Sequence, residues 1–291
     1  MDLDAIAAWL REESGIQVSA ASSRAVAGGC INEARLLDRI DGGSVFLKLN
    51  RADRIDVFEA ERSCLDLIAA SGTVRVPRPH ALGKVGETAV LAMEGLEMTS
   101  RSDAAAQGRL GEAIAALHGH ASPDGRCGCD FDDFIGATPQ PNPWTDSWAD
   151  FFSEHRLEHQ LRLAAEKGRD FPEAPRLVEK VHRHLDKLKI EPALLHGDLW
   201  GGNVAFTADA EPVIYDPASY YGDPETDIAF TGMFGGFGPA FYSAYRRRFP
   251  APEPVRETVY NLYHLLNHFN LFGGGYGRQA ESAIEEILRR L

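Results

Sequence analysis

The 291-residue sequence contains few cysteines and no long apolar run, and both shortages limit the class of protein that it can encode. Four cysteines in a chain of this length do not form a disulfide framework, which favours a reducing compartment. No segment approaches the roughly 20 consecutive apolar residues of a membrane-spanning helix, and the acidic N-terminus is unlike a secretory signal. We therefore expect a soluble, cytoplasmic protein without a membrane partner.

Positive charge is also scarce, because 30 lysines and arginines face 43 aspartates and glutamates, and the formal net charge is −13. Binding to a nucleic-acid backbone requires clustered basic side chains, and the longest basic run is Arg246–Arg248. We therefore expect no nucleic-acid partner. The remaining composition, 44% hydrophobic and 25% charged, is typical of a globular chain with a sizeable core.

The pattern of apolar residues divides the chain into a first third rich in strands and a helical remainder. In the first third we expect helices over 2–13 and 55–70, and strands over 17–27, 33–39, 44–49, 79–83 and 88–93. In the remainder we expect helices over 103–118, 144–167, 174–188 and 256–272, a loop over 121–143, and short strands over 193–196, 203–206 and 212–216. The predicted fold class is α+β, with a small, mostly antiparallel sheet lobe (1–94) that holds one inserted helix and a larger, mostly helical lobe (95–291).

The segment from His196 to Asn203, His-Gly-Asp-Leu-Trp-Gly-Gly-Asn, carries the clearest chemical signal. It fits the catalytic-loop pattern H-x-D-x-x-x-x-N of kinases. A carboxylate in such a loop can accept the proton of the hydroxyl that receives a phosphoryl group, so Asp198 is the candidate base. An amide oxygen five residues later can reach a metal held by the phosphates, which makes Asn203 a candidate metal ligand.

A second acidic position, Asp216, follows the apolar run Pro212–Tyr215. A carboxylate that leaves a short hairpin strand at this point can hold Mg²⁺ against the β- and γ-phosphates of a nucleotide. Asp216 stands where protein kinases have the aspartate of Asp-Phe-Gly, here followed by Pro217 and Ala218.

Lys48 is the single charged residue of the apolar stretch Val45–Leu49. A buried ammonium requires anions, which nucleotide phosphates and a helix carboxylate can supply. The next helix offers Glu59 and Glu61, which lie two residues apart and cannot share a helix face. We favour Glu61 as the partner of Lys48. The alternative is a surface lysine on an edge strand.

Two further segments are candidates for nucleotide binding. Gly28, Gly29 and Cys30 lie in a glycine-rich loop (27–32) between predicted strands, and its backbone N–H groups could line a phosphate. Such a pair of glycines can also be an ordinary turn. Met93 and Glu94 end the last strand of the first lobe, where a contact to adenine is expected. The alternative there is a plain linker.

Together these residues resemble the protein-kinase-like, bilobal fold in its small-molecule branch, which includes aminoglycoside phosphotransferases and choline kinases and has His-Gly-Asp in the catalytic loop. Narrower matches resemble the fructosamine kinase (ketosamine-3-kinase) family. The matching segments are 28–32, 58–61, 138–142, 148–152, 196–204 and 215–227. The resemblance runs from about residue 20 to the C-terminus.

The resemblance implies phosphorylation of the 3-hydroxyl of a ketoamine, the rearranged adduct of a sugar with an amine or a protein lysine, by ATP with Mg²⁺. The product is unstable and releases the amine, so the implied activity is deglycation. The implied roles are a base (Asp198), a phosphate-binding lysine with its glutamate (Lys48, Glu61), metal ligands (Asn203, Asp216) and substrate contacts (Trp200, His196). The alternative for Trp200 is a packing role.

The sequence departs from the family at Cys127 and Cys129, where an aromatic-Gly-aromatic sequence is usual. The nature of the substrate-side loop therefore stays open. Cys30 resembles a family cysteine that pairs with its counterpart in a second chain, which implies either a monomer or a redox-sensitive homodimer. The alternative is an inert thiol.

Two other functions remain possible at this point. One is a kinase of another hydroxylated amine, such as an aminoglycoside, and the other is a pseudokinase that only binds nucleotide. The Trp-Gly-Gly-Asn and Thr-Pro-Gln-Pro-Asn sequences favour the ketosamine kinase over the first. The presence of Lys48, Asp198, Asn203 and Asp216 argues against the second.

Overall fold

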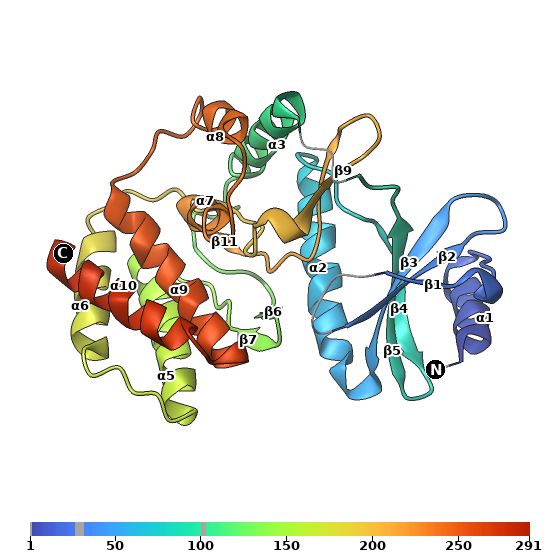
Figure 1. Cartoon of the computed structure of the whole chain (residues 1–291), viewed down its shortest axis with the longest axis horizontal. Helices are drawn as coiled ribbons and strands as arrows, with labels where there is room; N and C mark the ends of the chain where they lie inside the picture. Colours follow the sequence, from blue (N-terminus) through green and yellow to red (C-terminus); the bar gives the residue numbers. More distant parts are fainter. Residues whose placement is uncertain (1, 27–31, 100–102) are drawn as a thin grey trace.

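The computed structural model describes residues 2–26, 32–99 and 103–291, and a five-stranded antiparallel sheet forms the centre of its N-terminal part. The strand order is β1-β2-β3-β5-β4. The strands are β1 (Arg24–Ala25), β2 (Glu33–Asp38), β3 (Ser44–Arg51), β4 (Pro79–Val85) and β5 (Thr88–Gly95). Helix α1 (Leu3–Ser14) packs on one face of the sheet and α2 (Ile55–Ser71) on the other, between the sheet and the rest of the molecule (Figure 1).

Strand β3 shows why Lys48 lies where it does. Successive side chains of a strand point to opposite faces, and Val45, Leu47 and Leu49 all belong to the apolar cluster on the α1 side. Phe46 packs against the cluster on the α2 side. Lys48 is two residues after Phe46 on the same strand and therefore lies on the face that α2 covers.

The C-terminal part is mainly helical, as expected (Figure 1). Its helices are α3 (Ala104–Leu117), α4 (Trp148–Phe152), α5 (His159–Glu166), α6 (Ala174–Leu185), α7 (Glu225–Thr231), α8 (Pro239–Tyr245), α9 (Pro254–Phe272) and α10 (Tyr276–Arg290), with a π-helical segment at Ser153–Glu158. Three short strand pairs interrupt them: β6 (Asp133–Ile135) with β7 (Thr138–Gln140), β8 (Ala193–Leu194) with β11 (Tyr221–Gly222), and β9 (Val204–Phe206) with β10 (Pro212–Ile214). Among the described residues, no helix combines the length and hydropathy needed to cross a bilayer.

One apolar core joins the two parts of the chain. It contains Phe58 and Leu65 of α2 and Leu91 of β5, together with Leu110 of α3 and Phe241 of α8. A second core lies within the helical part, among α4, α5, α6, α9 and α10. The sheet therefore does not stand as a separate body, because apolar residues of α2 and β5 share a core with residues from later in the sequence.

Two predictions about local structure are wrong, and two helices lie where no element was predicted. The strand expected over 17–27 is largely replaced by a 3₁₀ turn at Ala20–Ser22, and β1 has two residues; residue 27 lies outside the described part. Ser22 Oγ donates to Ser19 O at 2.7 Å and accepts from Asp38 N at 2.8 Å, so side-chain bonds compete with a regular ladder. The loop expected over 121–143 contains the β6–β7 hairpin, and α7 and α8 occupy a stretch without a predicted element.

Candidate active site

Lys48 joins two carboxylates from distant parts of the chain. Its ammonium lies 2.6 Å from Glu61 Oε1 and 2.6 Å from Asp216 Oδ1. Glu61 makes the contact, whereas Glu59 is exposed on another side of α2. Burial lowers the pKa of Lys48, but the two carboxylates raise it by more, so its net shift is upward and the ammonium stays charged. The residue is only 8% exposed and β3 lies between two strands, which rules out an exposed lysine on an edge strand.

Asp198 and Asn203 lie within direct hydrogen-bonding distance of each other. Asn203 Nδ2 donates to Asp198 Oδ2 and to the Asp198 backbone oxygen, both at 2.9 Å. A 3₁₀ turn over Gly201–Asn203 closes the loop and brings the amide back to the carboxylate. Burial raises the pKa of Asp198 to about 7, with further increases from the charges of Asp216 and Asp227. A carboxylate with a pKa near neutrality is well suited to accept a proton from a hydroxyl.

His196 is corrected from a substrate contact to a residue that holds the loop in place. Its ring is fully buried. Nε2 lies 3.0 Å from the Tyr215 carbonyl oxygen, to which it donates, and Nδ1 accepts from Asp198 N at 3.2 Å. Burial lowers the pKa of His196, in keeping with a neutral ring that donates at one nitrogen and accepts at the other.

Gly197 explains why this loop has glycine between the histidine and the aspartate. Its φ is +83°, and a Cβ at this position would lie 1.7 Å from the carbonyl oxygen of Ala218. The two segments also share a backbone hydrogen bond, from Ala218 N to His196 O at 2.9 Å. Asp216 itself has a left-handed backbone, with a φ of 56°, which aspartate tolerates better than most residues. Close packing thus fixes the separation between Asp198 and Asp216.

Asp227 anchors the catalytic loop, and sequence reasoning assigned it no role. Its carboxylate accepts hydrogen bonds from the backbone N–H groups of His196 (2.7 Å) and Gly197 (2.8 Å) and from the ring of His118 (3.0 Å). Burial raises the pKa of Asp227, but these donors, led by His118, lower it by more, so the net shift is downward. The signal that could have revealed it was an acidic residue directly before the apolar run Ile228–Phe230.

Asn203 and Asp216 each have an oxygen that no described residue bonds. The Asn203 amide uses Nδ2 for Asp198, which leaves Oδ1, and Asp216 uses Oδ1 for Lys48, which leaves Oδ2. Oxygen donors of this kind suit Mg²⁺, which commonly takes one or two protein ligands and completes its shell with water and phosphate. Within the described residues, no cluster of three or more His, Cys, Asp or Glu offers a complete metal site.

Trp200 has both a packed and a partly open environment. Its ring lies over Gly202, where a Cβ would come within 2.2 Å of the indole, and its centroid is 5.8 Å from that of Phe234. The indole is half-buried. Trp200 therefore packs within its own loop and still presents a surface next to Asp198.

The predicted nucleotide-binding residues are only partly described. Gly28, Gly29 and Cys30 lie outside the described residues. Met93 is buried in the core shared by the two parts of the chain. The Glu94 carboxylate forms an ion pair with Arg75 at 2.9 Å. The adenine contact at Met93 and Glu94 remains a prediction.

Arg156 contacts both of the segments 138–142 and 148–152 and was missed from the sequence. It lies in the π-helical segment and is fully buried. NH1 donates to Pro141 O at 2.8 Å, NH2 donates to Asn142 Oδ1 at 2.6 Å, and the guanidinium carbon lies 4.1 Å from the centroid of Tyr220. π-Helical turns are frequent at functional sites. This arginine explains why the segments 138–142 and 148–152 occur together.

A buried polar chain continues from this motif to α2. Gln140 Nε2 donates to Asp133 Oδ1 at 2.7 Å, and the Tyr263 hydroxyl donates to Gln140 Oε1. The Cys64 thiol donates to Asp133 Oδ2 at a sulfur–oxygen distance of 3.7 Å. Burial raises the pKa of Asp133 to about 7. These hydrogen bonds connect α2, in the first part of the molecule, to residues of the second part.

Cys127 and Cys129 are buried free thiols. Burial raises the pKa of Cys127 to about 12 and that of Cys129 to about 11. Thiols with such high pKa values are poor nucleophiles and poor metal ligands. In this chain they serve as small packing residues of the apolar core.

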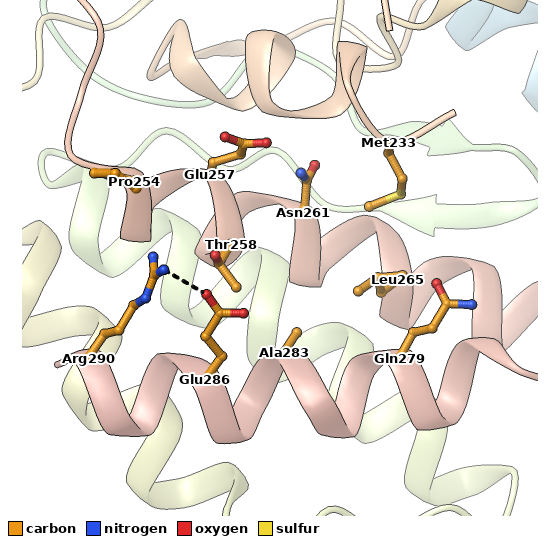
Figure 2. A pocket seen from close by; sticks show the side chains of 10 residues that line it. All are labelled: Met233, Pro254, Glu257, Thr258, Asn261, Leu265, Gln279, Ala283, Glu286 and Arg290. Atoms are coloured by element: carbon orange, nitrogen blue, oxygen red, sulfur yellow. Dashed lines mark ion pairs between the residues drawn. The ribbon is translucent and has the colours of Figure 1, made fainter. Parts of the chain in front are cut away.

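A groove runs between α9 and α10 (Figure 2). An ion pair between Arg290 and Glu286, with a nitrogen–oxygen distance of 3.1 Å, closes one end of it. None of the predicted site residues lines this groove. Its lining consists of Met233, Pro254, Glu257, Thr258, Asn261, Leu265, Gln279, Ala283, Glu286 and Arg290.

Comparison with known proteins identifies the family. The family model described as fructosamine kinase matches residues 2–290. The chain belongs to the fructosamine kinase family. This member is 47% identical to a Synechocystis protein named as a probable ketoamine kinase, over 98% of this chain and 96% of that protein. It is 39% identical to a chloroplastic protein-ribulosamine 3-kinase of Arabidopsis thaliana, over 100% of this chain and 90% of that protein.

Solved structures confirm the predicted fold class. A Haemophilus somnus protein assigned as a fructosamine-3-kinase superposes with a TM-score of 0.89 at 32% identity, over 97% of this chain and 96% of that chain. An aminoglycoside phosphotransferase in complex with ADP and hygromycin B superposes with a TM-score of 0.67 at 15% identity, over 98% of both chains. The fructosamine kinase fold is therefore that of the protein-kinase-like phosphotransferases, and the second comparison bears on the fold alone.

Proposed function

We propose that this fructosamine kinase family member phosphorylates the 3-hydroxyl of ketosamines with ATP and thereby removes sugars from amines or protein lysines. The observation that carries the proposal is the assembly of Lys48, Glu61 and Asp216 next to Asp198 and Asn203 in a chain of this family. The relatives named ketoamine kinase and protein-ribulosamine 3-kinase support ketosamines as the acceptor class.

Each of these residues has a task in the proposed reaction. Asp198 accepts the proton of the sugar hydroxyl as the phosphoryl group is transferred, and Asn203 orients its carboxylate. The Lys48 ammonium binds nucleotide phosphates and Glu61 holds it in position. Asn203 Oδ1 and Asp216 Oδ2 would hold Mg²⁺, which supplies charge neutralisation on the phosphates when it is bound. Trp200 would lie beside the acceptor sugar.

The proposal assigns binding of the nucleotide to one lobe and binding of the acceptor to the other. Residues 1–94 would bind the nucleotide through the loop that contains Gly28, Gly29 and Cys30, with Met93 and Glu94 near the adenine. Residues 95–291 would supply the catalytic loop and the acceptor side. The location of Lys48 on the sheet and of Asp198 and Asp216 in the later part of the chain supports this division.

The proposed activity is tested by measuring ATP turnover against a panel of acceptors. The panel contains a ribose-derived ketoamine, a fructose-derived ketoamine and an aminoglycoside, and the phosphorylated position is read by ³¹P NMR. Asp198→Asn serves as the blank, and Asp209→Asn, which changes an exposed aspartate of the β9–β10 turn, is the matched control. Turnover of a ketoamine at its 3-hydroxyl, absent from the blank and retained in the control, is the expected result.

Turnover of the aminoglycoside alone would show that the acceptor is another hydroxylated amine and not a ketosamine. Nucleotide binding without turnover of any acceptor would support the pseudokinase instead. The assay therefore separates the three functions.

The cytoplasmic location and the redox-sensitive homodimer through Cys30 remain predictions. If Cys30 pairs with its counterpart, an oxidant should produce a dimer on non-reducing gels that the Cys30→Ser variant does not form. A dimer that persists in this variant would contradict the prediction.

A further inference from the structure

Five rings form a continuous strip that begins at the catalytic loop. We call it the aromatic strip: Trp200, Phe234, His268, Phe272 and Tyr276. The ring centroids of Trp200 and Phe234 are 5.8 Å apart, and those of Phe234 and His268 are 5.0 Å apart. His268 then meets Phe272 at 5.8 Å and Tyr276 at 5.1 Å. Trp200 is two residues from Asp198, so the strip starts in the loop that carries the proposed base.

Much of this strip is exposed. Phe234 is 41% exposed and Phe272 is 56% exposed, although both belong to the residue types most often buried. Large exposed apolar side chains that contact a common neighbour form a patch, and such patches mark interaction sites. Here the common neighbour is His268.

The backbone holds the strip in place. Phe234 precedes two glycines with left-handed φ angles, Gly235 (103°) and Gly236 (71°), so the chain turns directly after the ring. His268 and Phe272 lie one turn apart on α9, on one side of the helix. His268 Nδ1 donates to the His264 carbonyl at 2.7 Å, which fixes the imidazole. The strip is therefore a preformed wall rather than a loose loop.

The electrostatics of the wall suit a cation. Burial lowers the pKa of His268, so this ring carries no charge at neutral pH. The nitrogen of a ketoamine is a protonated secondary amine, and cations are attracted to the faces of aromatic rings. Methylene groups beyond that nitrogen would gain by contact with the exposed rings.

We propose that the aromatic strip binds the amine-bearing part of the acceptor, and that its preferred occupant is the side chain of a peptide lysine that carries the sugar. The sugar lies at the Trp200 end, and the lysine methylenes extend along Phe234 towards Phe272. This inference rests on the proposed function, because it assumes a ketoamine whose 3-hydroxyl faces Asp198. The strip determines specificity for what the sugar is attached to, whereas the catalytic loop acts on the sugar itself.

The test compares two acceptors that share one sugar and one ammonium. They are the ribose-derived ketoamine of methylamine and the same ketoamine on the lysine of a short blocked peptide. For the unaltered protein, kcat/KM is expected to be at least about tenfold higher for the peptide. Phe272→Ser should remove most of this ratio, chiefly by raising KM for the peptide, while Phe272→Tyr, which keeps a ring, should preserve it.

Ile40→Ser is the matched control, because Ile40 is 68% exposed and lies in the turn between β2 and β3, far from the strip along the chain. It should leave the ratio unchanged, and thermal unfolding verifies that each variant folds. Equal kcat/KM for the two acceptors, or a ratio that Phe272→Ser does not alter, would overturn the inference while turnover of the methylamine adduct upholds the proposed function. If neither adduct is turned over while ATP binds, both proposals fail.

Discussion

Asp198 and Asp133 are both carboxyl groups whose pKa burial raises to about 7, yet their surroundings differ. Asp198 is partly open and bonds the side chain of Asn203. Asp133 is almost fully buried and bonds Gln140. The first can therefore exchange a proton with a bound substrate, whereas the second acts on the stability of the fold.

Asp198→Asn is expected to reduce kcat by about 100- to 10,000-fold, the range for loss of a general base. The asparagine keeps the size of the side chain and a hydrogen-bonding partner for Asn203, so ATP affinity should change by less than about threefold. Steady-state kinetics and nucleotide titration measure the two effects. A variant that keeps normal turnover would remove Asp198 from the reaction.

Asp133→Asn should change how stability depends on pH. In the unfolded chain this carboxyl loses its proton near pH 4, whereas in the folded chain it keeps the proton to about pH 7. Between these values the folded state binds the additional proton, so the free energy of unfolding contributed by Asp133 falls by about 1.4 kcal/mol per pH unit as pH rises.

The variant lacks this dependence, so its free energy of unfolding relative to the unaltered protein should rise between pH 5 and pH 7 and level off above. Urea denaturation at a series of pH values measures the difference. Parallel stability curves for the two proteins would contradict the assignment.

The catalytic loop is the element on which the site depends, and its geometry rests on one glycine. Gly197→Ala places a Cβ against the Ala218 carbonyl and forces a left-handed backbone on alanine. We expect a loss of at least about 2 kcal/mol in the free energy of unfolding. Gly201→Ala is the control in the same loop, because no atom lies within 4 Å of its added Cβ, and it should cost less than about 0.5 kcal/mol. Chemical denaturation measures the free energy of unfolding of both variants, and an equal loss in the two would contradict the role of Gly197.

Helices and strands whose apolar residues recur at a regular spacing were predictable from the sequence, and elements without such a spacing were not. The apolar face of α9 gave its position within about two residues of the observed start, because Val259, Leu262 and Leu266 repeat at helical spacing. Helix α7 is buried on every side, polar residues included, so no exposed polar face reveals a helical period. The hairpin of β6 and β7 has strands of three residues, too short for an alternation to show.

The residues of the candidate site also divide into those that the sequence could predict and those that it could not. Lys48, Asp198, Asn203 and Asp216 were predictable because their spacing follows from the chemistry of phosphoryl transfer. The roles of Asp227 and Arg156 depend on partners far along the chain, such as the His196 amide and the Pro141 carbonyl. No local pattern encodes those contacts. For the same reason His196 was expected at the substrate and proved to be buried.

At the scale of the whole molecule, the shared core makes the two parts of the chain depend on each other. We expect residues 2–95 alone not to fold, because Phe58 and Leu65 would lose the later residues with which they share a core and would be exposed to water. The complete chain should unfold in one transition, with calorimetric and van't Hoff enthalpies that agree. Circular dichroism of the fragment and calorimetry of the whole chain test this. A fragment that folds would show that the sheet is an independent domain.

The ion pairs of Lys48 have a consequence for how the protein folds during its synthesis on the ribosome. Glu61 follows the lysine by 13 residues, whereas Asp216 follows it by 168. At about 5–20 residues per second, the second carboxylate is synthesised on the order of 10 to 30 s after the lysine. During that interval α8, which shares an apolar core with α2, has not yet been synthesised, and the nascent chain is a natural client for chaperones that shield such exposed surfaces. The charge cluster is therefore completed only late in synthesis.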